Sequence, residues 1–176
     1  MHDPHEPERP DPETVENHQR MIRSLLEELM QSERSAQLHC IREARRLGDT
    51  DPGRALRACA AHARQVNSEL RRFARERSIT RGRLGRVVGR LFSRARASVL
   101  DRFVDEERSY RGTLVGLRHG IDVALMLQHA ADASGQVELA GFITRWLDER
   151  KPLVDDVAKA MTWFALHPDV ALAHPA

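Results

Sequence analysis

Four side chains that can bind a metal ion fall on the apolar stripes of predicted helices. Glu33, His62 and Glu107 are each flanked by apolar residues three and four positions away, and Tyr110 follows Glu107 by three positions. Imidazole and carboxylate groups bind iron and manganese, and a buried carboxylate is costly unless it is paired or metal-bound. The candidate metal ligands are therefore Glu33, His62, Glu107 and Tyr110.

The same residues also have an ordinary structural interpretation. Glu33 and Glu107 can pair with arginine or with His62, or can lie closer to solvent than the stripe indicates. Arg150 falls near the inner face of the last predicted helix, where its positive charge opposes metal binding. The sequence leaves both interpretations open, and it contains no nucleophile motif, phosphate loop or Rossmann fingerprint.

Three consecutive acids occur in the stretch FVDEERSY. Glu107 lies four positions after Phe103 and three before Tyr110, so it is predicted to point inward. Asp105 and Glu106 fall off the stripe, with Glu106 close to its border, and are predicted to be solvated.

Depth along the helices decides whether these groups meet. At about 1.5 Å per residue, Glu33 lies about 14 residues and His62 about 10 residues from the loop joining the first two predicted helices. If the third predicted helix starts at that same end, Glu107 is about 13 residues down, and the three groups share a layer within about one turn. This agreement requires the middle connection to run the length of the molecule.

An arginine-rich stretch, "SITRGRLGRVVGRLFSRARA", is a second candidate site. It fits phosphate contacts to nucleic acid, an acidic partner or an anionic membrane surface. It has one aromatic residue, Phe92, and no recognised nucleic-acid motif. The alternative is a short helix that packs its apolar residues inward and leaves the arginines solvated or paired. The candidate anion-binding residues are Arg81, Arg83, Arg86, Arg90 and Arg94.

Helical periodicity and end signals divide the chain into four long helices. Asp11-Pro12 and Asp51-Pro52 are typical of helix starts, because proline suits the first helical position, and Gly48 is typical of a helix end. The predicted helices span residues 12–47, 52–77, 94–133 and 136–166. Pro152 is predicted to kink the last helix near Asp148.

The remaining segments connect or flank these helices. Residues 1–11 carry three prolines and are predicted to be a disordered tail. Residues 12–167 form one helical domain, with 78–94 as its long middle connection and 168–176 as a loose tail.

Four long helices joined by two short loops and one long middle connection resemble the ferritin-like superfamily, in particular small bacterial stress-associated bundles. The resemblance covers residues 12–166. It implies an all-α four-helix bundle with a long helix 2–3 crossover, and metal ligands that include Glu-x-x-His on two helices. That motif occurs in none of the predicted helices.

The leading hypothesis is a degenerate or absent di-metal site and a non-catalytic structural, interaction or stress-related role without a cofactor. The alternatives are an iron or manganese oxidoreductase or iron-handling protein, and nucleic-acid or acidic-partner binding through the arginine-rich stretch.

Composition sets the broad class. The 176 residues are 41% hydrophobic and 31% charged, which is typical of a globular protein. No apolar run is long enough to span a membrane, and no apolar core of a signal peptide is present, so we expect a cytoplasmic protein. Lysine occurs only at 151 and 159, which suggests a GC-rich bacterial genome.

Two further features concern packing. Cys40 and Cys59 are nearly equidistant from the first loop and are predicted to be facing, buried thiols in a reducing compartment. Val115, Val123 and Met126 lie off the main stripe of the third predicted helix and suggest a second buried face. On that basis we expect a homo-oligomer, with a dimer favoured.

Overall fold

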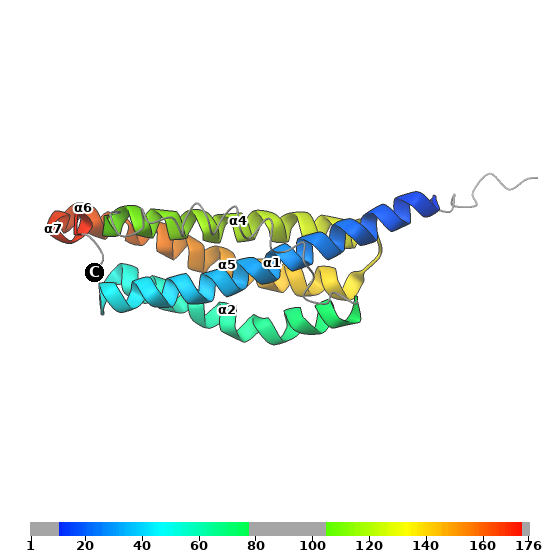
Figure 1. Cartoon of the computed structure of the whole chain (residues 1–176), viewed down its shortest axis with the longest axis horizontal. Coiled ribbons are helices and arrows are strands. Elements are labelled where there is room, and N and C mark those ends of the chain that lie inside the picture. The colour runs from blue at the N-terminus through cyan, green and yellow to red at the C-terminus, as the bar shows by residue number, and fades with distance from the viewer. Residues whose placement is uncertain (1–10, 78–104, 174–176) are drawn as a thin grey trace, which may run out of the picture.

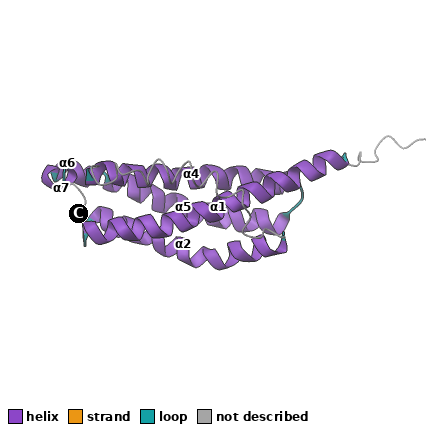
Figure 2. Cartoon of the chain, in the orientation of Figure 1, coloured by secondary structure: helices purple, strands orange, loops and turns teal. Residues whose placement is uncertain are grey.

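The computed structural model describes residues 11–77 and 105–173, and all regular secondary structure in these ranges is helical (Figure 2). The all-α prediction is therefore confirmed. Four helices are long and two short ones follow: α1 (Pro12–Leu47), α2 (Asp51–Glu76), α4 (Glu106–Ala133), α5 (Val137–Ala160), α6 (Thr162–Leu166) and α7 (Pro168–Ala171).

The helix ends follow local chemistry. The Asp11 side chain accepts a hydrogen bond from the Glu13 backbone at the start of α1, and Thr50 accepts one from Gly53 at the start of α2. Gly48 ends α1 with a φ of 63°, a conformation that favours glycine. The predicted helix 136–166 is divided, because α5 continues through Pro152 to Ala160 and a turn at Met161 separates it from α6.

The four long helices lie side by side (Figure 1). Both α1 and α5 pack against α2 and α4, so α1 and α5 are diagonal to each other. Near the end of α1, Arg46 binds Glu106 at the start of α4, with Nε 2.8 Å from Oε1. Just beyond α2, Arg77 donates to the Gln136 side chain just before α5, with Nη2 2.6 Å from Oε1.

These contacts fix the chain directions. Helices α2 and α4 start at the same end and run in the same direction, so residues 77 and 105 lie at opposite ends of the molecule (Figure 1). The common starting end of α2 and α4 is the condition set above for Glu33, His62 and Glu107 to share a layer. The predicted connection 78–94 itself lies outside the described residues.

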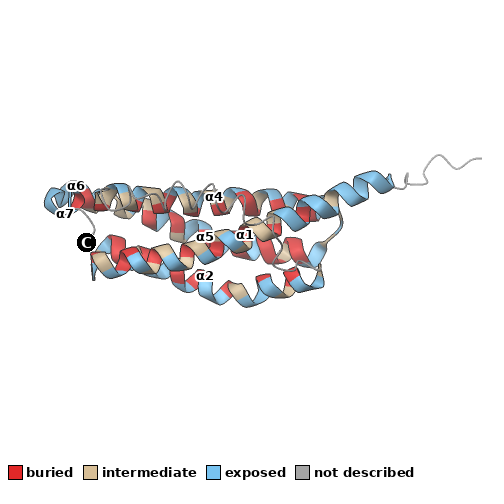
Figure 3. Ribbon diagram, viewed as in Figure 1, coloured by how far each residue is buried: buried red, intermediate tan, exposed pale blue. Residues whose placement is uncertain are grey.

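Buried residues occur along all four long helices (Figure 3). They form two apolar clusters, one toward each end of these helices. On α1, the first cluster ends at Leu29 and the second begins at Ala36. On α5, the corresponding residues are Leu147 and Val154. The residues between these limits, Glu33 and Arg150, therefore lie where the two clusters meet.

Most residues predicted to face inward are buried, with exceptions near helix ends. The start of α1 extends beyond the other helices (Figure 1), and Val15, in the first turn of α1, is 39% exposed. Val137, in the first turn of α5, is 80% exposed. Val99 and Phe103 lie outside the described residues. The suggested second face of α4 is divided, since Val123 is buried in the first cluster while Val115 and Met126 are exposed.

The segment predicted to be a loose tail is held against the start of α4. Helix α7 packs against α4, Ala171 is buried, and the Glu106 backbone N–H donates to the Ala173 carbonyl at 2.9 Å. None of the helices within residues 11–77 and 105–173 has an apolar stretch sufficient to cross a membrane.

Candidate functional site: a buried ion pair between two apolar clusters

Glu33 and Arg150 form an ion pair at the junction of the two apolar clusters. Arg150 Nη2 donates to Glu33 Oε2. The Arg150 side chain is 1% exposed and the Glu33 side chain is 2% exposed. Arg150 Nη1 donates to the Cys59 carbonyl on α2 at 3.1 Å. The guanidinium also lies over the Trp146 ring, 5.3 Å from its centroid. One side chain thereby connects α1, α2 and α5.

The electrostatics of the pair reflect its burial. Removal from water raises the pKa of Glu33 above its ordinary value of 4.5, and the charge and hydrogen bond of Arg150 offset part of that rise. Burial of charge costs several kcal/mol per ion unless a partner compensates. The Arg150 guanidinium is the partner that compensates the Glu33 carboxylate.

His62 lies beside this pair on α2. Its Nε2 donates to Glu149 Oε2 at 3.0 Å, and its ring packs near Trp146, with centroids 6.2 Å apart. The His62 side chain is buried whereas Glu149 is 56% exposed. Burial and the positive charge of Arg150 lower the pKa of His62, and Glu149 opposes this shift. His62 Nδ1 is buried and has no hydrogen-bond partner within the described part of the chain, which fits a neutral ring.

The stretch FVDEERSY differs from its predicted orientation. Glu106, predicted to be solvated, is buried and accepts from Arg46. Glu107, predicted to point inward, is 34% exposed and pairs with Arg111 one turn later on α4, with its Oε1 2.5 Å from Nε. The reason is the contact between α1 and α4, which places Arg46 opposite Glu106 and turns the next residue toward the surface. Because α4 begins at Glu106, Glu107 lies in its first turn beside the end of α1, about 20 Å along the axis from Glu33. The predicted layer shared by Glu107, Glu33 and His62 is therefore wrong.

Tyr110 is buried as predicted, but its hydroxyl forms a hydrogen bond to the backbone. The hydroxyl donates to the Val157 carbonyl at 2.9 Å, and its ring packs against Phe164, with centroids 5.2 Å apart. Burial is the main cause of a raised pKa for Tyr110. A protonated phenol held by a carbonyl is a poor metal ligand.

The four candidate ligands do not fit a di-metal centre. Each of them is engaged by another group, and Glu33 is engaged by a cation. Within the ranges that the structure describes, no three histidine, cysteine, aspartate or glutamate side chains are grouped closely enough to hold a metal ion. The donor set therefore indicates an ion-paired core layer.

A second buried polar network, between α1 and α4, was missed at the level of sequence. Glu43 Oε1 accepts from Thr113 at 2.6 Å and from Ser109 at 3.0 Å. The Ser109 hydroxyl in turn accepts from Arg46 at 3.2 Å. Glu43 lies three positions after Cys40 and four before Leu47, so the stripe rule that selected Glu33 would also have selected Glu43.

Cys40 and Cys59 are both buried and both free. Burial is the largest cause of raised pKa values for the two thiols. Thiols that stay protonated are weak nucleophiles and weak metal ligands. They therefore pack as small apolar side chains, as predicted.

The arginines Arg81, Arg83, Arg86, Arg90 and Arg94 lie outside the described residues. Their proposed contacts to nucleic acid or to an acidic partner thus stay a prediction. Comparisons of the chain with protein-family models, with curated proteins and with solved structures find no match.

Proposed function

We propose that the protein is a ferritin-like four-helix bundle with a degenerate or absent di-metal site and a non-catalytic role as a structural or interaction protein. The single observation that carries the proposal is the Glu33–Arg150 ion pair at the junction of the two apolar clusters. In ferritin-like metal proteins, carboxylates in the bundle core are neutralised by metal ions. Here a guanidinium supplies the positive charge.

The chain directions support the bundle assignment. Helices α2 and α4 run in the same direction, which is the order produced by one long crossover connection and differs from up-down-up-down order. The short connections α1–α2 and α4–α5 join antiparallel neighbours. The proposal for the fold therefore rests on topology as well as on helix length.

Metal content tests the functional proposal. The protein is purified after expression with added iron or manganese, and metal per chain is measured by elemental analysis. Because Arg150 already neutralises the Glu33 carboxylate, we expect less than about one metal ion per ten chains. We also expect that iron or manganese added to the purified protein leaves the thermal midpoint unchanged, because only a ligand that binds the folded state raises it.

The matched variants are Glu33→Gln, which alters the core carboxylate, and Glu107→Gln, which alters the surface one. Stoichiometric metal in the wild type that is lost in Glu33→Gln and kept in Glu107→Gln would overturn the proposal. It would support the alternative iron or manganese protein. Equal and trace metal in all three proteins would agree with the proposal.

A further inference from the structure

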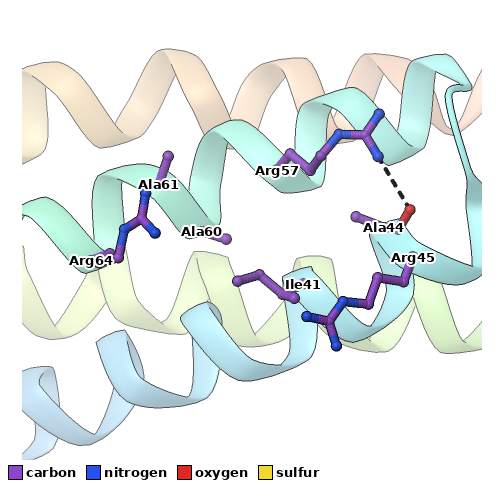
Figure 4. Close-up of a pocket in the computed structure, with 7 residues that line it drawn as sticks. All are labelled: Ile41, Ala44, Arg45, Arg57, Ala60, Ala61 and Arg64. Atoms are coloured by element: carbon purple, nitrogen blue, oxygen red, sulfur yellow. Dashed lines mark hydrogen bonds between the residues drawn. The ribbon is translucent and has the colours of Figure 1, made fainter.

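A shallow groove runs between α1 and α2 on the outer face of the molecule (Figure 4). Its volume is about 310 Å³. Helix α1 contributes Ile41, Ala44 and Arg45 to its lining, and α2 contributes Arg57, Ala60 and Arg64. We call this surface the α1–α2 groove.

The floor of the groove is apolar, and it is open because the apolar side chains that α2 contributes are small. Ile41 and Ala60 point toward one another across the groove (Figure 4), and an alanine side chain is too short to fill the space between the helices. Leu38 lies three positions before Ile41 on α1 and is 69% exposed. Residues three apart share a helix face, so Leu38 adds an exposed apolar side chain on the same face of α1 as Ile41.

Arginines bound the groove at both ends. Arg64 lies at one end, and Arg45 and Arg57 lie at the other (Figure 4). Arg57 is held in place by the carbonyl of Gly48, 3.0 Å from its Nη1, and by the Asp49 carboxylate. Among the residues that the structure describes, no carboxylate pairs with Arg45 or Arg64, and both side chains are exposed.

The spacing of these residues is regular. On α1, Arg34, Leu38, Ile41 and Arg45 follow at intervals of four, three and four, which places two apolar residues between two arginines on one face. On α2, Arg57, Arg64 and Arg71 follow at intervals of seven, or about 10.5 Å along the axis. Of this series, Arg57 and Arg64 line the groove, so a helix laid along it would meet two positive charges about two turns apart.

We propose that the α1–α2 groove binds an amphipathic helix of a partner protein that carries an apolar stripe flanked by carboxylates at seven-residue spacing. The inference rests on the proposed interaction role and names the surface and partner chemistry for it. Helices commonly bind by laying an apolar face in an apolar groove. Charge complementarity at the rim then adds orientation and selectivity.

Nucleic acid fits this surface less well. Proteins that bind single strands use aromatic side chains on which bases stack, and none of the described residues that line the groove is aromatic. An apolar floor gains nothing from a phosphate backbone. The arginines alone suit either partner, so the apolar floor decides between them.

The test uses a fluorescent, monomeric helical peptide of about 21 residues with a leucine stripe flanked by glutamates at seven-residue spacing. Its anisotropy is measured against the full-length protein. The comparison probes are the same peptide with serine in place of leucine and a single-stranded DNA of about 21 nucleotides. We expect saturable binding of the leucine peptide only, weakening as salt is raised.

Matched variants locate the contact. Arg45→Glu/Arg64→Glu reverses the rim charge, whereas Arg108→Glu/Arg118→Glu makes the same charge change on exposed residues of α4. The first pair should weaken binding at least about tenfold and the second less than about twofold. Hydrogen exchange should show peptide-dependent protection in 34–45 and 57–64.

Three outcomes would overturn the inference. The leucine peptide does not saturate up to about 1 mM, or the serine peptide and the DNA bind as well as the leucine peptide, or both charge reversals weaken binding equally. Metal content measured on the same preparations keeps the two proposals separate. Failed peptide binding with trace metal removes only the groove inference. Stoichiometric metal that is lost in Glu33→Gln and kept in Glu107→Gln overturns the proposed function whatever the peptide does.

Discussion

Glu33 on α1 and Arg150 on α5 are paired across the diagonal of the four long helices, with both side chains almost completely excluded from solvent. A buried pair is strongly destabilising to break, although an apolar replacement of both partners is often tolerated. Two kinds of substitution at this pair are therefore expected to give opposite results.

Glu33→Ala should lower the free energy of unfolding by about 3–5 kcal/mol, because it leaves the Arg150 charge buried without its carboxylate. Glu33→Leu/Arg150→Met removes both charges. Its free energy of unfolding should lie within about 1 kcal/mol of the wild-type value or above it. Urea unfolding of the wild type, Glu33→Leu, Arg150→Met and the double variant measures the coupling. Glu16→Ala, an exposed acid on the same helix, is the control. Additive effects of the Glu33 and Arg150 changes would contradict this prediction.

His62 should make stability depend on pH below its ordinary pKa of 6.5. Its pKa is lowered in the folded state, so the unfolded chain takes up the proton first as pH falls. The stability contributed by neutral His62 is complete above pH 6.5 and is lost as pH falls toward the lowered folded value. Denaturant unfolding between pH 7.5 and 4.5, at about one-unit steps, should show a steeper loss for the wild type than for His62→Gln. Parallel profiles would show that His62 contributes nothing to the pH dependence.

The hydroxyl of Thr113 should stabilise the buried Glu43 carboxylate. Thr113→Val keeps the side-chain shape and removes the hydrogen bond of 2.6 Å to Glu43. We expect a loss of about 1–3 kcal/mol, because a buried carboxylate loses a donor. Thr144→Val is the comparison, since the Thr144 side chain is exposed on α5 and donates to a helix carbonyl. Equal losses at the two threonines would argue against a special role for the Glu43 network.

Gly120 permits the close approach of α1 and α4. A Cβ atom added at Gly120 would lie 2.6 Å from the Ser32 hydroxyl oxygen. Alanine in place of glycine inside a helix normally gains up to about 1 kcal/mol. In the wild-type background, Gly120→Ala should give no such gain in the free energy of unfolding. In a Ser32→Ala background it should give the gain. Calorimetry or urea unfolding measures both. A gain of the same size in both backgrounds would mean that Ser32 does not restrict this position.

Much of the fold could be predicted from periodicity and helix-end residues. Pro12 and Gly48 mark the ends of α1 because proline and glycine act through their own backbones, with little help from distant contacts. The burial of Glu33, His62 and Tyr110 also followed from helical spacing alone.

The partners of those residues could not be predicted in the same way. Whether Glu33 meets a metal ion or Arg150 depends on where α5 lies relative to α1, and spacing within one helix contains no such information. The same limit explains Glu106 and Glu107, whose orientations depend on the position of Arg46 on a different helix. Spacing identifies which face of a helix is buried, while the pairing of helices decides the chemistry on that face.

The hydrogen bond from the Glu106 backbone to the Ala173 carbonyl has a consequence for the order of folding. Asp105 makes no side-chain capping bond at the start of α4. The Ala173 carbonyl instead accepts the hydrogen bond of the first N–H of the helix. During synthesis, the contacts between α1 and α2 can form while α4 still lacks this partner, because residue 173 emerges much later from the ribosome. The junction of α1, α4 and α7 is thus expected to close last, after the α1–α2 hairpin has already formed.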